Sequence, residues 1–387
     1  MDDRTVFEGC VESISFSGGV VRFGESVFFV PFTCPGDVIR ARVVNGKKHV
    51  AALVGISEAS RDRVEPPCAL FGICGGCTLQ HIGYAAQIEQ KKKIVSDSLK
   101  RIGGLDVLPA IGMVTSPQYG YRNRVELHTD GRITGFKQAK SAKIIPAHTC
   151  PAAVPVIRDY LQNAAEPSRA RKGPPVQPPK RYAVYGFDDR IAVEGGGVEK
   201  LFVPGLDVTM DARIFFQSNL ELQKKLVADV AAAAGTGETA ADLYCGVGAF
   251  ARSLSARFQK LCLVEENPAA IALARENLRS MPTEAEYYAL SLKKYCATLE
   301  KNARPAAPRW DVVVADPPRE GLCPPLVSLF VRLKTPRLIY VSCNPVALAR
   351  DAKLLREGGY RLDSITCYDF YPQTLHIECV AVFCYGE

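Results

Sequence analysis

The chain from residue 206 to the C-terminus alternates apolar stretches of strand length with stretches of helix length. This alternation predicts a parallel, doubly wound α/β sheet, because parallel strands need crossover connections that are usually helices. A long helix over about 217–234 precedes the first strand. The expected strands are 239–245, 260–266, 285–291, 311–316, 337–343, 360–370 and 377–384.

The last two expected strands, 360–370 and 377–384, have no room for a helix between them. They should therefore form an antiparallel hairpin at the end of an otherwise parallel sheet. A terminal hairpin of this kind is typical of the methyltransferase version of the fold and distinguishes it from a dinucleotide dehydrogenase.

A cysteine follows one of the predicted strands. The run Leu-Ile-Tyr-Val at 338–341 reads as a buried strand, and Ser-Cys-Asn-Pro at 342–345 ends it abruptly. An isolated cysteine is usually a small core residue. Cys343 instead ends the apolar run, at the carboxyl edge where open α/β sheets bind ligands. We therefore interpret Cys343 as a candidate nucleophile.

A glycine-rich turn follows the first strand of the same region. The stretch Asp-Leu-Tyr-Cys-Gly-Val-Gly-Ala-Phe-Ala at 242–251 matches G-x-G-x-x-A, and Glu265 ends the next strand. Glycines such as Gly246 let the backbone approach a ligand, while the acid binds ribose hydroxyls. This predicts a nucleotide-type cofactor. The motif alone does not separate a nicotinamide cofactor from S-adenosylmethionine.

Two further carboxylates lie in unusual settings. Asp316 opens Asp-Pro-Pro-Arg-Glu-Gly at a strand end, where it suits a contact to a nucleobase; the alternative is a helix cap. Glu378 lies in the apolar run Ile-Glu-Cys-Val-Ala-Val-Phe, near His376. Burial should raise the pKa of Glu378 and suit it to proton transfer, although strand alternation would also permit a solvated position.

A cysteine cluster lies much earlier in the chain. Cys68, Cys74 and Cys77 have the spacing C-x5-C-x2-C, and Cys150 precedes a proline in a loop. Closely spaced thiols without a nearby histidine suit an iron–sulfur cluster or zinc, each with four ligands, and Cys150 is the candidate fourth. The alternative is a set of unrelated core cysteines. Fourteen cysteines without a signal peptide indicate a reduced, cytoplasmic protein and not a disulfide framework.

The remaining segments suggest three domains: a small β-barrel in residues 1–60, a central domain in 61–205 and the α/β domain in 206–387. The net charge of +7 is concentrated in the middle, which suits a polyanionic partner. Residues 84–101 predict an amphipathic helix whose Lys-Lys-Lys run would be a solvated face. Tyr-Gly-Tyr-Arg-Asn-Arg at 119–124 suits single-stranded RNA or, equally, a core with exposed arginines. The Pro-rich stretch 166–181 predicts a flexible basic loop.

Together, the four cysteines and the motifs DLYCGVGAF, DPPREG, VSCNP and HIE resemble the RNA uracil-5-methyltransferase family over nearly the whole chain. The most similar branch carries an N-terminal TRAM barrel and an iron–sulfur cluster, and it modifies large-subunit ribosomal RNA. The resemblance implies that the four cysteines hold a 4Fe-4S cluster that supports RNA recognition. It also implies that Gln217, Tyr244, Glu265 and Asp316 contact cofactor or base. The family often has Asn where this chain has Ala249, so a side-chain contact there is not expected.

The resemblance implies a reaction. The Cys343 thiolate would add to C6 of uracil, so that C5 gains enolate character and attacks the methyl group of S-adenosylmethionine. Glu378 is the candidate base for the C5 proton. Ribosomal RNA is the expected partner, and no membrane or obligate protein partner is implied. Transfer RNA is an open alternative substrate, and a nicotinamide-dependent oxidoreductase or a non-catalytic RNA-binding factor is a further alternative.

Overall fold

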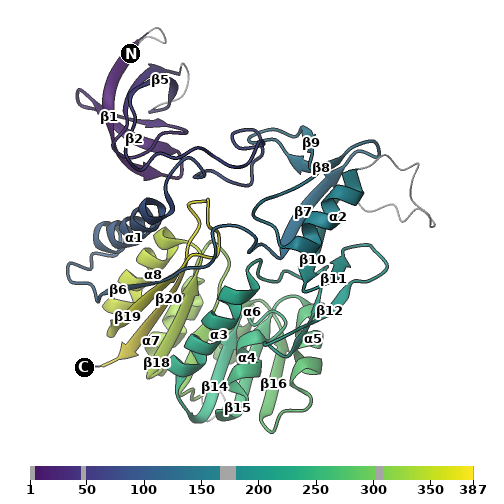
Figure 1. Ribbon diagram of the computed structural model, residues 1–387. Coiled ribbons are helices and arrows are strands. Elements are labelled where there is room, and N and C mark those ends of the chain that lie inside the picture. The colour runs from purple at the N-terminus through teal and green to yellow at the C-terminus, as the bar shows by residue number, and fades with distance from the viewer. Residues whose placement is uncertain (1–4, 45–48, 166–179, 302–307, 387) are drawn as a thin grey trace.

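The computed structural model describes residues 5–44, 49–165, 180–301 and 308–386. Five short strands at the N-terminus form a curled antiparallel sheet in the order β3-β2-β1-β4-β5, coloured purple to dark blue in Figure 1. Alternate side chains of these strands, among them Phe7, Val21 and Ile39, fill a small core of their own. This arrangement agrees with the predicted barrel. The strands are β1 Val6–Ser15, β2 Gly18–Phe23, β3 Ser26–Val30, β4 Val38–Val43 and β5 Ala51–Glu58.

Helix α1 spans Tyr84–Arg101, as predicted, and its buried positions recur every three or four residues, as one helical face requires. One of these positions is Lys91, which is fully buried and paired with Asp369. The prediction that the lysine run is a solvated face is therefore wrong for Lys91. Lys92 and Lys93 do lie at the surface, in pairs with Glu89 and Asp97.

The central part of the chain forms a second antiparallel sheet in the order β11-β10-β7-β8-β9, with helix α2 (Pro155–Ala165) packed on it. The predicted basic loop at 166–181 lies almost wholly outside the described residues. The strands are β7 Arg124–Thr129, β8 Thr134–Lys137, β9 Ile144–Pro146, β10 Arg181–Phe187 and β11 Arg190–Val193, followed by the hairpin β12 Lys200–Val203 and β13 Val208–Asp211.

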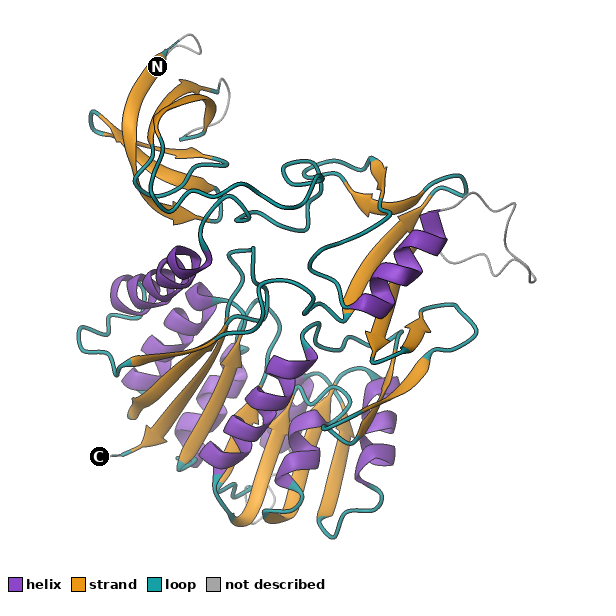
Figure 2. Ribbon diagram, viewed as in Figure 1, coloured by secondary structure: helices purple, strands orange, loops and turns teal. Residues whose placement is uncertain are grey.

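The C-terminal sheet has eight strands in the order β16-β15-β14-β17-β18-β20-β19-β6 (Figures 1 and 2). The predicted parallel strands pair as expected, and β20 runs antiparallel to both neighbours, which confirms the terminal hairpin. The strands of this sheet are β6 Ile111–Val114, β14 Gly237–Leu243, β15 Phe258–Glu265, β16 Glu284–Ala289, β17 Val312–Ala315, β18 Arg337–Ser342, β19 Tyr360–Tyr368 and β20 Glu378–Tyr385.

Helices cover both faces of this sheet, so the predicted doubly wound fold is confirmed. One hydrophobic core lies under α3, α4 and α5, and the other lies under α1, α6, α7 and α8. The helices are α3 Leu220–Ala234, α4 Ala249–Leu254, α5 Pro268–Leu278, α6 Leu292–Lys301, α7 Pro324–Leu333 and α8 Pro345–Glu357. No helix in the described segments is long and apolar enough to cross a membrane.

The edge strand β6 (Ile111–Val114) was not anticipated from the sequence. It pairs in parallel with β19, with Ile111 opposite Ile365 and Val114 opposite Tyr368. The C-terminal sheet thus includes a strand from the stretch interpreted as central domain, and the antiparallel central sheet lies in the chain between β6 and α3.

Candidate active site

One cavity of about 1110 Å³ opens at the carboxyl ends of β14, β15, β17 and β18 and beside the start of β20. This is the edge at which open α/β sheets bind ligands, because each strand ends there in a loop free to carry a polar side chain. The cavity brings together all seven residues predicted for cofactor binding and catalysis. They are Gln217, Tyr244, Gly246, Glu265, Asp316, Cys343 and Glu378.

The glycine turn after β14 has the backbone that its sequence requires. Tyr244, Gly246 and Gly248 all have positive φ, at 64°, 53° and 84°. A Cβ on Gly248 would lie 3.2 Å from the Cβ of Ala274, so a side chain there would crowd α5. The Glu265 carboxylate accepts hydrogen bonds from the backbone N–H of Gly246 (3.2 Å) and from that of Asn267 (2.8 Å).

The loop after β17 is held by a hydrogen bond to Asp351 of α8. Asp351, which is buried, accepts hydrogen bonds from the N–H of Leu322 and the hydroxyl of Tyr340, both at 2.8 Å. Asp316 itself does not cap a helix, because the next helix, α7, has Cys323 at its N-cap. The helix-cap alternative is thus wrong. Burial raises the pKa of Asp316 to about 7.

The Ser-Cys-Asn-Pro turn places Cys343 between β18 and α8. The Asn344 side chain caps α8 by accepting from the N–H of Val346 (3.1 Å), and it donates to the carbonyl of Arg319 (2.9 Å). This bond ties the cysteine turn to the Asp316 loop. Burial raises the pKa of the Cys343 thiol to about 12; the negative charges of Glu378 and Asp316 add to the rise, and Arg319 opposes it.

Glu378 begins β20 on the strand that pairs with β18. The register places Ser342 opposite Cys379, so Cys343 and Glu378 lie at adjacent positions where the two strands end. Glu378 is only 3% exposed, which rules out the solvated alternative. Its Oε1 makes no hydrogen bond within the described residues, and burial raises the pKa of this carboxyl well above its usual range.

Several neighbours of these groups were not singled out as site residues from the sequence. The Arg319 guanidinium lies 3.5 Å from Nδ1 of His376, and burial lowers the pKa of His376 to about 4. The Tyr371 ring lies 5.9 Å from the His376 ring. Phe16, from the β1–β2 turn, lies 6.0 Å from the same ring and is 59% exposed. Only an exposed aromatic in a tight turn marks Phe16 in the sequence, a signal too common to be specific.

One family model and several known proteins match this chain, and two of the proteins match it along nearly its full length. The family model for tRNA (uracil-5-)-methyltransferases matches residues 208–384. A 23S rRNA (uracil(1939)-C(5))-methyltransferase from Xanthomonas axonopodis pv. citri is 31% identical, covering 98% of each chain. An uncharacterised RNA methyltransferase from Halalkalibacterium halodurans is 30% identical over 99% of this chain and 97% of that protein.

The chain belongs to the RNA uracil-5-methyltransferase family.

A solved structure of a related methyltransferase has the same fold as this chain. The tRNA (uracil-54, C5)-methyltransferase of Pyrococcus abyssi, in complex with S-adenosyl-L-homocysteine, superposes with a TM-score of 0.72 at 26% identity, covering 97% of this chain and all of that one. The glycine motif left a nicotinamide and S-adenosylmethionine as alternatives, and the family is S-adenosylmethionine-dependent. The cavity fits such a cofactor: it offers the oriented Glu265 carboxylate, and the buried Oε1 of Gln217 has no hydrogen-bond partner within the described residues.

The four candidate metal-binding cysteines lie near one another. Burial raises the pKa of the Cys74 thiol, and the proximity of Cys150, Cys77 and Cys68 adds to the rise. Nevertheless, in the part of the chain that the structure describes, no group of three or more His, Cys, Asp or Glu side chains has the geometry of a metal site. All fourteen cysteines are free thiols. The cluster therefore remains a prediction.

Arg122 lies beside these thiols and bears on whether they suit a cluster. Burial raises the pKa of Cys77, and the Arg122 guanidinium opposes that rise. Nε of Arg122 is buried and makes no hydrogen bond within the described residues. A guanidinium without a carboxylate partner favours an anionic neighbour, and a cluster held by four thiolates is anionic. The charge around the four thiols, though not their arrangement, suits an anionic cluster.

The Tyr-Arg stretch at 119–124 was predicted either to bind single-stranded RNA or to place its tyrosines in the core, and its residues differ in this respect. Tyr121 is 6% exposed and donates to the carbonyl of Pro372 (3.0 Å), so it is a core residue. The Arg124 guanidinium carbon lies 5.6 Å from the ring centroid of Phe215, which is 62% exposed and lines the cavity. A role for the arginines in RNA binding stays a prediction.

Proposed function

We propose that this enzyme forms 5-methyluridine in 23S ribosomal RNA through a covalent bond between Cys343 and C6 of the target uracil. The observation that carries the proposal is the meeting of Cys343, Glu378 and Asp316 in one cavity next to the glycine turn. The full-length similarity to a 23S rRNA methyltransferase supports the choice of RNA. Action on ribosomal RNA implies a cytoplasmic protein.

Addition of sulfur to C6 is the first step that the residues of the cavity support. The thiol is protonated in the resting enzyme, because its pKa is about 12. Asp316, with a pKa of about 7, is partly ionised at neutral pH and accepts the thiol proton. The thiolate then forms a bond to C6, and the electron pair of the C5–C6 double bond moves toward the ring carbonyl. The protonated Asp316, assisted by Gln217, hydrogen-bonds the enolate.

Removal of the C5 proton completes the reaction. S-adenosylmethionine, when bound, supplies a methyl group on a sulfonium, which C5 attacks. Glu378 in its ionised form takes the C5 proton; a carboxylate whose pKa burial has raised is a stronger base than an exposed one. The C5–C6 double bond forms again and the C6–sulfur bond breaks. Cys343 leaves as thiolate and takes back the proton that Asp316 held, and Glu378 releases the C5 proton to solvent.

The residues that we assign to S-adenosylmethionine lie just before α3 and at the ends of β14 and β15. Gly246 lets the backbone approach the cofactor, Glu265 accepts from ribose hydroxyls, and Tyr244 and Gln217 complete the contact. We also propose that Cys68, Cys74, Cys77 and Cys150 bind a 4Fe-4S cluster. Its role is structural, because it joins the segment before α1 to the loop before α2.

We assign the N-terminal barrel, a TRAM domain in this proposal, to binding the RNA that surrounds the target uracil. A uracil in folded RNA must leave its stack to reach a cavity at a sheet edge. The barrel in residues 1–60 and the central domain in 61–205 then hold the surrounding nucleotides, while residues 206–387 carry the chemistry. The contact between Phe16 and His376 supports this division, because it brings the barrel to the rim of the cavity.

Two substitutions test the mechanism. Cys343→Ala should abolish methylation of 23S rRNA while leaving RNA binding intact, and Glu378→Gln should accumulate a covalent enzyme–RNA adduct that survives a denaturing gel. Cys384→Ala, which removes a thiol at the far end of β20, is the matched control and should methylate normally. Methylation by Cys343→Ala would refute the assignment of the nucleophile.

A second candidate substrate is transfer RNA, favoured by the similarity to the Pyrococcus abyssi tRNA enzyme. Mapping 5-methyluridine in ribosomal and transfer RNA from cells lacking this protein decides between the two. Loss of the modification from transfer RNA alone would contradict the proposed substrate and leave the mechanism standing.

A further inference from the structure

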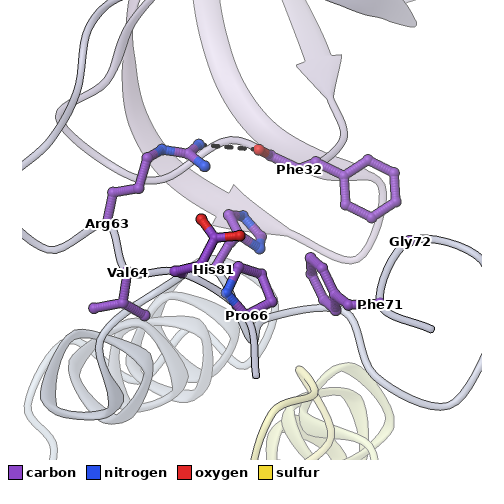
Figure 3. Close-up of a pocket in the computed structure, with 8 residues that line it drawn as sticks. Phe32, Arg63, Val64, Pro66, Phe71, Gly72 and His81 are labelled. Carbon is purple, nitrogen blue, oxygen red and sulfur yellow. Dashed lines mark hydrogen bonds between the residues drawn. The ribbon is translucent and has the colours of Figure 1, made fainter. Parts of the chain in front are cut away.

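A second cavity, of about 510 Å³, lies between the N-terminal barrel and the segment that leads into the cysteine cluster (Figure 3). None of its lining residues lines the methyl-transfer cavity. Its volume falls in the range typical of small-ligand pockets, about 300–1,000 Å³. Neither the cofactor nor the target uracil accounts for it.

Three aromatic rings from three different segments surround this cavity. The Phe32 and Phe71 ring centroids lie 5.7 Å apart, with planes at 81°, and the Phe71 and His81 centroids lie 5.5 Å apart. Phe32 is 45% exposed although its ring is large and apolar. Figure 3 shows the Phe32 and Phe71 rings facing the same space. Flat apolar faces that remain open to solvent are suited to a flat ligand.

The backbone of Phe32 is held in a conformation that a phenylalanine rarely adopts. Its φ is 63°, in the left-handed region, where a side chain crowds the backbone. Arg63 donates to the Phe32 carbonyl at 3.0 Å, and the buried Asp37 carboxylate holds the Arg63 guanidinium through two hydrogen bonds. An ion pair with a buried carboxylate thus fixes a strained, exposed aromatic residue. Strain maintained in this way is typical of binding sites.

His81 forms an uncharged wall of the cavity. Its Nε2 lies 3.1 Å from the carbonyl of Thr33; a carbonyl only accepts, so we assign the hydrogen to Nε2. Burial lowers the pKa of His81 to about 4, and the ring is therefore neutral at physiological pH. The buried Nδ1 is left as an acceptor without a partner in the described residues. Glu65 adds a second acceptor to the lining.

We propose that this cavity binds one unstacked nucleobase of the RNA substrate. This base belongs to a nucleotide other than the uridine that is methylated. The inference rests on the proposed function in requiring that RNA is the substrate. Aromatic side chains stack bases of any kind, and the two acceptors, Glu65 and His81, favour a base that carries an exocyclic amine: adenine, cytosine or guanine. Uracil has no such amine.

The cysteine loop helps to shape the site. Phe71 lies between Cys68 and Cys74, in a tight turn in which its N–H donates to the carbonyl of Cys68 (2.9 Å) and the N–H of Cys74 donates to that of Leu70 (2.8 Å). These backbone hydrogen bonds of Cys68 and Cys74 therefore hold both ends of the turn that presents the Phe71 ring. This gives the cysteine loop a direct part in RNA binding.

The test measures binding of the full-length protein to three fluorescent probes, the single-stranded RNAs rA10, rC10 and rU10. Phe32→Ala and Phe71→Ala should each weaken binding of rA10 and rC10 by roughly 5- to 150-fold, which corresponds to about 1–3 kcal/mol per stacked base. Phe32→Leu, which keeps an apolar side chain but no ring, should show the same loss if folding is unaffected. Phe202→Ala removes an equally exposed aromatic on β12 and should bind as wild type.

The outcomes separate this site from the proposed function. If the wild-type protein methylates 23S rRNA and binds rA10, but the Phe32 and Phe71 variants bind with unchanged affinity, the cavity is not a base-binding site. Equal loss for rU10 would overturn the preference for an amino-bearing base. If the wild-type protein neither binds nor methylates any RNA, the proposed function itself is wrong. Methylation at saturating RNA should persist in Phe32→Ala, because that residue is outside the methyl-transfer cavity.

Discussion

The buried pair of Lys91 and Asp369 provides the sharpest test of how the active-site loop is held. Nζ of Lys91 donates to the Asp369 carboxylate and to the carbonyl of Tyr371 (3.1 Å), and the Tyr84 hydroxyl donates to the same carboxylate at 2.8 Å. Both charged side chains are 0% exposed. The pair fixes the start of the loop that ends at Glu378. Replacing Lys91 by Met leaves a buried carboxylate without its cation.

The expected loss follows from that burial. Removing one partner of a buried ion pair costs about 3–5 kcal/mol, because the remaining charge stays desolvated. Large domains lose about 2 °C of Tm per kcal/mol, so Lys91→Met should melt about 6–10 °C below wild type. The double variant Lys91→Met/Asp369→Asn removes both charges and leaves Tyr84 an acceptor. It should recover most of the loss, to within about 2 kcal/mol of wild type.

Thermal unfolding followed by circular dichroism measures these differences. Lys92→Met is the matched control: its ammonium forms a surface pair with Glu89 at 3.3 Å, and its loss should change stability by less than about 1 kcal/mol. If the double variant melts at or below the single variant, the destabilisation does not come from an unpaired charge, and the reasoning is refuted.

Three other predictions follow from individual groups. Methylation by the wild-type enzyme should fall as the pH drops below about 7, because Asp316 then becomes protonated and cannot take the thiol proton; a pH–rate profile that is flat from pH 6 to 8 would contradict this. Burial raises the pKa of Asp242 to about 7, above its value in the unfolded chain. Folding therefore takes up a proton in this range, and wild-type stability falls as the pH rises from about 4 to 7. The Tm of Asp242→Asn minus that of wild type should therefore be larger at pH 8 than at pH 5, and an equal difference at both would refute the assignment. Arg122→Leu, purified anaerobically, should contain less iron per chain than wild type or Arg122→Lys if the guanidinium neutralises a thiolate-bound cluster, and equal iron in all three would show that it does not.

The sheet and the composition of the methyl-transfer cavity were predictable because their signals are local. Each strand end carries its own polar residue, and the rules of parallel sheets bring those ends to one edge. Cys343 and Glu378 were thus expected to share a cleft before their register was known. The raised pKa of Glu378 also followed from its apolar neighbours in the sequence.

Features that depend on distant partners were not predictable. Lys91 looks like a surface residue in its own helix, and its partner is 278 residues away in the chain. Strand β6 has only four residues and no clear alternation. The second cavity arises where Phe32 of the barrel meets Phe71 and His81 of the next segment, and no sequence pattern encodes that packing. The Phe16–His376 contact has the same origin.

The pairing of β6 with β19 has a consequence for how the protein is made. Residues 111–114 leave the ribosome about 250 residues before their partners at 365–368, since synthesis proceeds from the N-terminus. Until then α1 also lacks α8, against which it packs. The nascent chain must therefore carry an unpaired strand and a helix whose buried face is uncovered through most of translation, and β6 is paired only after β19 (Tyr360–Tyr368) has emerged. A slow, late folding step, dependent on chaperones in the cell, is the expected result of such long-range pairing.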